Sequence, residues 1–322
     1  MSSLAGKRCY VAGHRGLLGS AVVRALDAAG YDAPIVRTRS ELDLLDQSAV
    51  RSFFAKEKPE IVFLAAAKVG GIQANNTQRW QFLYENLVLE SNVLGAAQEN
   101  GVEHFVFFGS SCIYPRMAPQ PIREDYLLTG PLEATNEPYA IAKIAGLKLV
   151  EAANAREGRR WVSVMPTNLY GPNDNFNLET SHVLPALIRK FHEAKEAREA
   201  GREATVTLWG TGTVRREFLH VDDAAGAALL LMEQGLTGLY NVGYGEDLPV
   251  KDLAALVANV VGYDGPVVWD SSRPDGTPRK LLDSSRIRAT GWAPKITLEE
   301  GVRSVYDWYR EASESLMARI GQ

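Results

Sequence analysis

A tyrosine and a lysine stand four residues apart at Tyr139 and Lys143, in a segment whose composition favours a helix. On a helix this spacing places the phenol and the ammonium group on one face. A free tyrosine has a pKa near 10, and a nearby ammonium group lowers that pKa by favouring the phenolate. Ser110, at the end of an expected strand, could hydrogen-bond the same substrate oxygen. These three residues predict acid–base chemistry at one substrate oxygen.

A glycine motif, Gly13-His-Arg-Gly16-Leu-Leu-Gly19, follows the first expected strand and opens the first expected helix. Glycine is needed where the backbone bends sharply and where it must approach a pyrophosphate. The N-terminus of the helix then offers unpaired N–H groups and a partial positive charge to that anion. A glycine motif between a strand and a helix near the N-terminus predicts that the protein binds a dinucleotide.

The residues that follow indicate which dinucleotide. Folds that use NAD usually carry an acidic residue about 20 residues beyond the loop, where it binds the ribose 2′-hydroxyl. Here that stretch carries Arg37 and Arg39, and Arg15 lies inside the loop. Guanidinium groups are suited to a 2′-phosphate, so the sequence favours NADP as NADPH. The alternative is that Arg37 and Arg39 are surface residues, while Glu41 or Asp43 holds a hydroxyl group instead.

The elements that must position these residues alternate between short apolar runs and amphipathic segments. This alternation is typical of an α/β protein with a doubly wound parallel sheet, a Rossmann domain covered on both faces by helices. We expect strands over 8–12, 33–37, 60–65, 104–108 and 161–165, and helices over 19–29, 47–58, 84–100 and 139–157.

After Pro166 the pattern becomes looser, and short strands over 206–209 and 267–269 accompany helices over 250–261 and 298–310. We expect a second, smaller α/β lobe there that binds the substrate. The expected NADP-binding domain is residues 1–168 with about 218–243, and the substrate-binding domain is 169–217 with 244–322.

Composition narrows the classes of partner. The chain of 322 residues has 35 Lys and Arg against 39 Asp and Glu, a net charge of −4 that argues against nucleic acid. Its two cysteines, Cys9 and Cys112, cannot form a disulfide framework, and no His/Cys cluster suggests a metal site. A reducing compartment, the cytoplasm, is therefore expected. No apolar run is long enough to predict a membrane span.

Several longer segments carry a family resemblance. They resemble the GDP-L-fucose synthases, a family among the extended short-chain dehydrogenase/reductases that act on nucleotide sugars, and the similarity runs through nearly the whole chain. The segments are Ala65-Ala-Ala-Lys-Val-Gly-Gly71, Gly109-Ser-Ser-Cys-Ile-Tyr-Pro115, Thr135-Asn-Glu-Pro-Tyr-Ala-Ile-Ala-Lys143, Met165-Pro-Thr-Asn-Leu-Tyr-Gly-Pro172, Glu217-Phe-Leu-His-Val-Asp-Asp223 and Pro274-Asp-Gly-Thr-Pro-Arg-Lys280.

The resemblance implies a bifunctional NADPH enzyme that converts GDP-4-keto-6-deoxy-D-mannose to GDP-L-fucose. It epimerises C3 and C5 and then reduces C4. Tyr139 would bind the C4 oxygen in both reactions, and Lys143 would also hold the nicotinamide ribose. Cys112 and His182 would be the acid and base of epimerisation. Without the resemblance, Cys112 reads as a small buried hydrophobic residue and His182 as a surface histidine.

A thiol with a neighbouring cation is easily ionised, which fits a role in proton transfer. Cys112 follows Ser110 by two residues, so on an extended segment both side chains would point to one side.

The resemblance also implies binding residues and an assembly. A homodimer would form through the helices over 84–100 and 139–157. The partner is a GDP-sugar. Besides Arg39 and the seven residues of the glycine motif (Gly13, His14, Arg15, Gly16, Leu17, Leu18 and Gly19), the cofactor residues are Phe108, Gly109, Ser110, Ser111, Lys143, Pro166, Thr167, Asn168, Leu169 and His182. The substrate residues are Lys190, Trp209, Arg216, Asp275 and Lys280.

Three other functions are weighed against this one. A 4,6-dehydratase usually needs an acidic pair where this chain has Ser110-Ser-Cys112, and none is present. A nucleotide-sugar 4-epimerase keeps a tightly bound NAD, which the arginines do not favour. A non-catalytic dinucleotide sensor tends to lose the Tyr/Lys pair, and Tyr139 and Lys143 are both intact.

Overall fold

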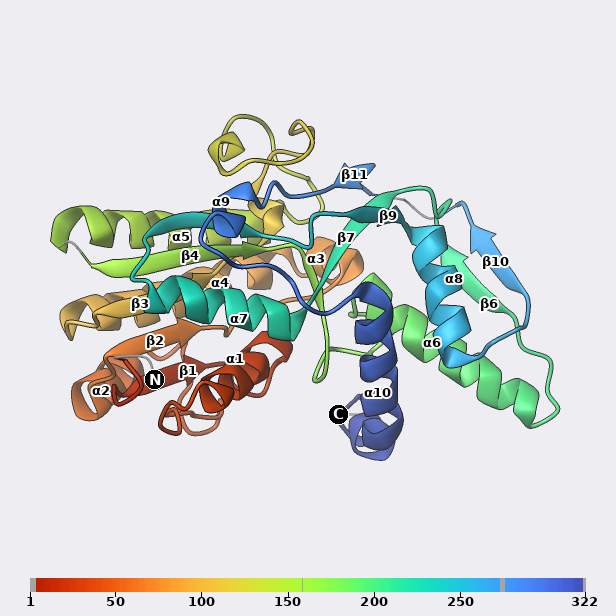
Figure 1. Ribbon diagram of the computed structural model, residues 1–322, viewed down its shortest axis with the longest axis horizontal. Helices are drawn as coiled ribbons and strands as arrows, with labels where there is room; N and C mark the ends of the chain where they lie inside the picture. Colours follow the sequence, from red (N-terminus) through yellow and green to blue (C-terminus); the bar gives the residue numbers. More distant parts are fainter. Residues whose placement is uncertain (1–3, 158, 273–275, 321–322) are drawn as a thin grey trace.

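The computed structural model describes the backbone of residues 4–157, 159–272 and 276–320. Its centre is a five-stranded sheet in the order β1-β2-β3-β4-β8, and every pair of neighbouring strands runs parallel (Figure 1). Nearly all residues of these strands are buried, as in a sheet covered on both faces. The strands are Cys9–Ala12 (β1), Ile61–Leu64 (β2), His104–Phe108 (β3), Arg160–Pro166 (β4) and Gly238–Val242 (β8).

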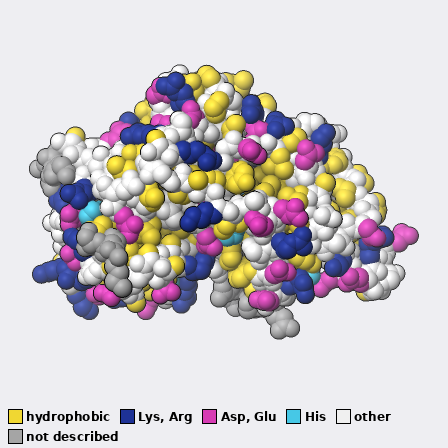
Figure 2. All heavy atoms as spheres, in the orientation of Figure 1, with side chains coloured by type: hydrophobic (Ala, Val, Ile, Leu, Met, Phe, Trp, Pro, Cys, Tyr) yellow, Lys and Arg dark blue, Asp and Glu magenta, His cyan; other side chains and the backbone are white. Residues whose placement is uncertain are grey.

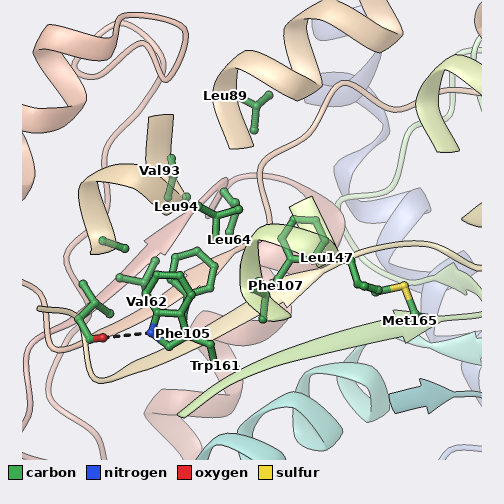
Figure 3. Close-up of a cluster of buried hydrophobic side chains, with 14 of the residues drawn as sticks. Val62, Leu64, Leu89, Val93, Leu94, Phe105, Phe107, Leu147, Trp161 and Met165 are labelled. Carbon is green, nitrogen blue, oxygen red and sulfur yellow. Dashed lines mark hydrogen bonds between the residues drawn. The ribbon is translucent and has the colours of Figure 1, made fainter. Parts of the chain in front are cut away.

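Helices cover the two faces of this sheet. Because successive strand residues point to opposite faces, Tyr10 packs in one hydrophobic cluster and Val11 in the other. Figure 3 shows part of the first cluster, where Trp161 also donates a hydrogen bond to the carbonyl of Val102. One face carries Gln47–Glu57 (α2), Arg79–Glu99 (α4) and Glu137–Glu157 (α5), and the other carries Leu17–Ala28 (α1) and Val221–Glu233 (α7). The predicted doubly wound Rossmann fold is confirmed.

The strand predicted over 33–37 is wrong. The segment forms a single bridge, between Ile35 and Tyr10, with hydrogen bonds from Val11 N to Ile35 O (3.1 Å) and from Ile35 N to Cys9 O (2.7 Å). Pro34 has no N–H to donate, and Asp32 and Ala33 are exposed at the edge of the sheet. The segment therefore lies beside β1 without continuing as a strand.

The second lobe is smaller and built on two sheets. Asn168–Tyr170 (β5), Arg215–His220 (β7) and Arg279–Lys280 (β11) run parallel, Asp247–Pro249 (β9) pairs antiparallel with β7, and Val206–Trp209 (β6) pairs with Val267–Asp270 (β10). These sheets pack with Val183–Glu199 (α6), Val250–Val261 (α8) and Leu298–Ile320 (α10) around a cluster that includes Phe176, Phe191 and Tyr309. Short helices lie at Ile72–Thr77 (α3), Ser111–Ile113 (η1), Glu124–Tyr126 (η2) and Ser285–Arg288 (α9).

The two lobes lie side by side, and Figure 2 shows the outline indented at its lower edge between the part that holds α1 and the part that holds α10. The chain crosses between the lobes several times, because β5 and β7 follow the central sheet while β8 returns to it. Across the described ranges, no helix has the length and apolar character needed to cross a bilayer.

Candidate active site

The glycine loop joins β1 to α1 and is built for close backbone packing. Gly13 has φ +85°, and a Cβ there would lie 2.8 Å from Ala66 N. A Cβ on Gly19 would overlap the carbonyl of Gly13, whereas one on Gly16 would meet nothing nearer than that oxygen, at 3.5 Å. Gly13 and Gly19 therefore pack the loop, and Gly16 leaves its outer side open. An open backbone at the N-cap of a helix fits a bound pyrophosphate.

The arginines after β1 have different surroundings. Arg37 donates to Glu57 Oε1 (2.8 Å) and lies over the Phe53 ring (5.5 Å from the centroid). Arg39 is 75% exposed and has Asp43 Oδ2 at 3.8 Å. Glu41 accepts hydrogen bonds from the backbone and side chain of Thr38, so it is already engaged. Arg39 is the guanidinium of this stretch that is free to reach a 2′-phosphate.

Tyr139 and Lys143 share a face of α5, as predicted, but Lys143 does not lower the pKa of Tyr139. Burial, with smaller contributions from Cys112 and Glu90, raises that pKa well above its usual range. Lys143 Nζ lies 2.8 Å from Glu90 Oε1 and donates to Phe108 O at 3.0 Å. The positive charge of Lys143 is thus largely balanced by a carboxylate, and Tyr139 remains a protonated phenol.

Cys112 lies in the short helix η1, so the expectation of an extended segment from Ser110 is wrong. Ser110 caps this helix, and its Oγ accepts from Cys112 N at 3.3 Å. The Cys112 sulfur has two polar neighbours, Asn136 Nδ2 at 3.2 Å and Lys280 Nζ at 3.6 Å. The helix η1 packs against α5, which carries Tyr139, and Cys112 contributes to the raised pKa of Tyr139.

His182 is the N-cap residue of α6, and the loop preceding it is held against the Rossmann domain. Gly71 N donates to Thr180 O at 2.8 Å, and a Cβ on Gly71 would lie 2.7 Å from Ser181 O. The surrounding protein lowers the pKa of His182 by desolvation, although its side chain keeps an exposed surface. His182 is therefore neutral near pH 7 and can be reached from solvent.

The predicted cofactor segment over 166–169 runs from the end of β4 into β5. Thr167 Oγ1 and Asn168 Nδ2 both donate to the carbonyl of Glu217, at 3.2 and 2.8 Å. The buried carboxylate of Glu217 accepts from Gly245 N (2.7 Å) and Leu282 N (3.1 Å). Glu217 thus connects this segment to the second lobe. Phe108, Gly109 and Ser111 lie at the end of β3, beside Ser110.

The predicted substrate residues fall into two groups. Lys190 donates to Thr207 O at 2.8 Å and lies 6.0 Å from the centroid of the Trp209 ring, which is 54% exposed. Burial lowers the pKa of Lys190. Arg216 and Lys280 are register partners on β7 and β11, and Lys280 reaches Cys112. Asp275 lies outside the described residues.

Two polar residues of the site were not singled out from the sequence. Asn136 precedes α5 and contacts the Cys112 sulfur. In the sequence, the feature that could have pointed to Asn136 is that it is a helix-capping type of residue three positions before Tyr139. Glu90 lies on the same stripe of α4 as Asn86, Val93 and Ala97, all buried. A carboxylate on an otherwise apolar helix face could have pointed to Glu90 in the sequence, because a buried carboxylate needs a partner of opposite charge.

Comparison with known proteins places the chain among relatives of one kind. The model of the NAD dependent epimerase/dehydratase family matches residues 9–243. The chain is 56% identical to the putative GDP-L-fucose synthase 2 of Arabidopsis thaliana over 306 residues, which cover 94% of this chain and 92% of the relative. It is 53% identical to the GDP-L-fucose synthase of Escherichia coli K12 over 315 residues, 95% of this chain and 97% of the relative.

A solved structure of a related enzyme has the same fold as this chain. The GDP-mannoheptose C4 reductase of Campylobacter jejuni, solved with NADP bound, superimposes with a TM-score of 0.88 at 40% identity, covering 95% of this chain and 99% of that one. The fold is thus that of NAD(P)-binding relatives. The chain belongs to the NAD dependent epimerase/dehydratase family, and within it to the GDP-L-fucose synthases.

Proposed function

We propose that the protein converts GDP-4-keto-6-deoxy-D-mannose to GDP-L-fucose, by epimerisation at C3 and C5 followed by reduction at C4. The curated relatives above carry this name, and their similarity spans nearly the whole chain. The observation that carries the proposal is the position of Cys112 in η1, which packs against α5, with its sulfur in contact with Lys280 and with Asn136, three residues before Tyr139. A reductase alone needs the phenol but has no use for a polar thiol beside it.

Epimerisation follows from the chemistry of a ketone. The C4 carbonyl acidifies the hydrogens on C3 and C5, and the raised pKa of Tyr139 keeps its hydroxyl able to donate to the C4 oxygen. Neutral His182 can accept a proton, and the Cys112 thiol can donate one. Acting on opposite faces of the ring, these two groups would exchange one proton for another and invert each centre.

Reduction uses the same carbonyl. NADPH, when bound, supplies the hydride, and Tyr139 gives its proton to the C4 oxygen as charge develops there. The residues that would hold the dinucleotide are the glycine loop with Gly16 open, Arg39 on the 2′-phosphate, Lys143 on the nicotinamide ribose and the segment over 166–169. His14 Nδ1 in the loop is buried with no hydrogen-bond partner among the described residues, which leaves it available to a ligand.

The remaining assignments belong to the same proposal. Residues 1–168 with about 218–243 would form the NADP-binding domain, and 169–217 with 244–322 would bind the GDP-sugar through Lys190, Trp209, Arg216, Asp275 and Lys280. The exposed apolar residues of α4 and α5 support a homodimer. Cys9 and Cys112 are both free thiols, which fits the cytoplasm.

The experiment is incubation of the purified protein with GDP-4-keto-6-deoxymannose and NADPH in D₂O, with the product identified by NMR. We expect GDP-L-fucose with deuterium at C3 and C5. Cys112→Ser should abolish deuterium uptake at these carbons, while Tyr139→Phe should abolish NADPH oxidation. NADPH oxidation without deuterium uptake would identify a C4 reductase, and no oxidation at all would contradict the proposal.

A further inference from the structure

The most completely buried charges of the site belong to Lys143 and Glu90. Their side chains are 2% and 1% exposed, and Nζ lies 2.8 Å from Oε1. Lys143 is on α5 and Glu90 is on α4, two helices that pack side by side on one face of the sheet. A charge of either sign is costly to bury alone, and each residue supplies the opposite charge for the other.

An ammonium group has three N–H donors. In Lys143 one N–H is donated to the carbonyl of Phe108, at the end of β3, and the positive charge is paired with Glu90 Oε1, 2.8 Å from Nζ. These two contacts fix where Nζ lies and limit the directions of its other N–H groups. We propose that Glu90 is a positioning residue for the reduction: with Phe108 O, it holds the Lys143 ammonium so that a remaining N–H serves Tyr139 and the bound nucleotide. This inference rests on the proposed function for the role of Lys143.

The helix packing is shaped for this carboxylate. Gly146 lies on α5 one turn beyond Lys143, and a Cβ there would lie 2.6 Å from Glu90 Oε2 and would also overlap the Phe107 ring. Glycine in the middle of a helix costs stability relative to alanine. The absence of a side chain at Gly146 leaves the space between the two helices that the Glu90 carboxylate occupies. Neither Glu90 Oε1 nor Oε2 has a hydrogen-bond partner among the described residues, so the ion pair with Lys143 is what offsets the burial of this carboxylate.

The charges around Lys143 and Glu90 determine in which direction the pH dependence of activity should change when the Glu90 charge is removed. Burial raises the pKa of Glu90, and Lys143 lowers it. Glu90 and Cys112 each contribute to the raised pKa of Tyr139. β3 places the Phe107 ring and the Phe108 carbonyl beside Lys143. Without the Glu90 charge, the Tyr139 phenolate becomes easier to form. This change moves the loss of activity at high pH to a lower pH.

The first test is the pH profile of NADPH oxidation in Glu90→Gln, which removes the charge and keeps the shape. We expect the basic limb of log kcat to move down by about one pH unit, and the Kd for NADPH, measured by fluorescence, to rise about tenfold. Glu90→Asp should recover most of both. The matched control is Glu99→Gln, an exposed position of α4 whose carboxylate pairs with Arg51.

The second test needs no substrate and covers the case in which Glu90→Gln folds poorly. Thermal unfolding is compared for Glu90→Met, Lys143→Met and the double variant. Removing one partner leaves a buried unpaired charge, whereas removing both leaves none, so the double variant should have a higher Tm than either single variant. Additive losses of Tm would contradict the pairing.

A basic limb and a Kd both unchanged in folded Glu90→Gln would contradict the positioning role even if the pairing holds. Failure of the proposed function would show differently, as a wild-type protein that does not reduce the ketosugar while the NADPH affinity and the Tm comparison still report on Glu90.

Discussion

Arg37 and Arg39 are two residues apart in the sequence but have different surroundings in the structure. Arg37 pairs with Glu57 and lies over the Phe53 ring, whereas Arg39 projects into solvent. Both occupy the stretch that we propose distinguishes a 2′-hydroxyl from a 2′-phosphate. The sequence places them there, but only the packing of α2 shows which one is free.

Arg39→Ala should therefore change the choice of cofactor. We expect the KM for NADPH to rise at least tenfold while the KM for NADH changes little, because an arginine paired with a phosphate is worth about 1.5–3 kcal/mol. Steady-state kinetics with both nucleotides checks this. Arg37→Ala is the matched control: it should lower the Tm through the loss of the Glu57 pair and leave the NADPH/NADH ratio near that of the wild type. An unchanged ratio in Arg39→Ala would place the 2′-phosphate elsewhere.

At the scale of elements, most helices and strands could be predicted because their apolar patterns are strong and local. The strand over 33–37 could not, because pairing of an edge segment depends on its neighbours and Pro34 removes a donor. The turn at Cys112 was missed because a three-residue helix has no periodicity to read. The partners of Lys143 and Cys112, Glu90 and Lys280, come from elements distant in sequence, so no local pattern could join them.

The glycine loop gives a prediction at this scale. Gly19→Ala places a methyl group against the carbonyl of Gly13, so it should destabilise the fold by about 1–3 kcal/mol. Gly16→Ala meets nothing closer than 3.5 Å and should leave the Tm within about 1 °C of the wild type, yet weaken NADPH binding because its methyl group occupies the space of the pyrophosphate. Thermal unfolding and fluorescence titration separate the two effects. Equal NADPH affinity in Gly16→Ala and the wild type would contradict the proposal that this loop binds the pyrophosphate.

At the scale of the whole molecule, one buried carboxyl should make stability depend on pH. Burial raises the pKa of Asp174 from 3.8 to about 7, and its Oδ2 has no hydrogen-bond partner among the described residues. Between these two values the folded protein binds more protons than the unfolded chain, so the Asp174 contribution falls as the pH rises from about 4 to about 7.

Asp174→Asn should remove that dependence and raise the free energy of unfolding by up to about 4 kcal/mol at pH 8, since the Asn175 N–H can still donate to the amide oxygen. Urea unfolding at pH 5 and pH 8 tests it, with the exposed Asp264→Asn as control. Parallel curves for wild type and Asp174→Asn would mean that the carboxylate has a partner in solution.

The outer faces of α4 and α5 determine how whole molecules would associate. Trp80 and Tyr84 stack on α4 with ring centroids 5.4 Å apart, and are 70% and 51% exposed. Ile141 and Leu149, eight residues apart on one face of α5, are 43% and 44% exposed. An exposed group of large apolar side chains on two adjacent helices is typical of a protein interface. The same helices carry Glu90, Tyr139 and Lys143 on their inner sides. A partner subunit packed against the outer faces of α4 and α5 would therefore restrict the movement of the helices that hold these residues.

Leu149→Glu should therefore convert a dimer into a monomer in sedimentation equilibrium at micromolar protein, because a buried carboxylate at the interface has no counter-charge. The rate of NADPH oxidation should fall with dissociation and recover partly as protein concentration is raised. Val268→Glu makes the same change at a 51% exposed position of β10 and should leave both the mass and the rate as in the wild type. If wild-type protein sediments as a monomer, the apolar face of α4 and α5 serves another contact. If Leu149→Glu is monomeric but fully active, each subunit holds its own helices in place.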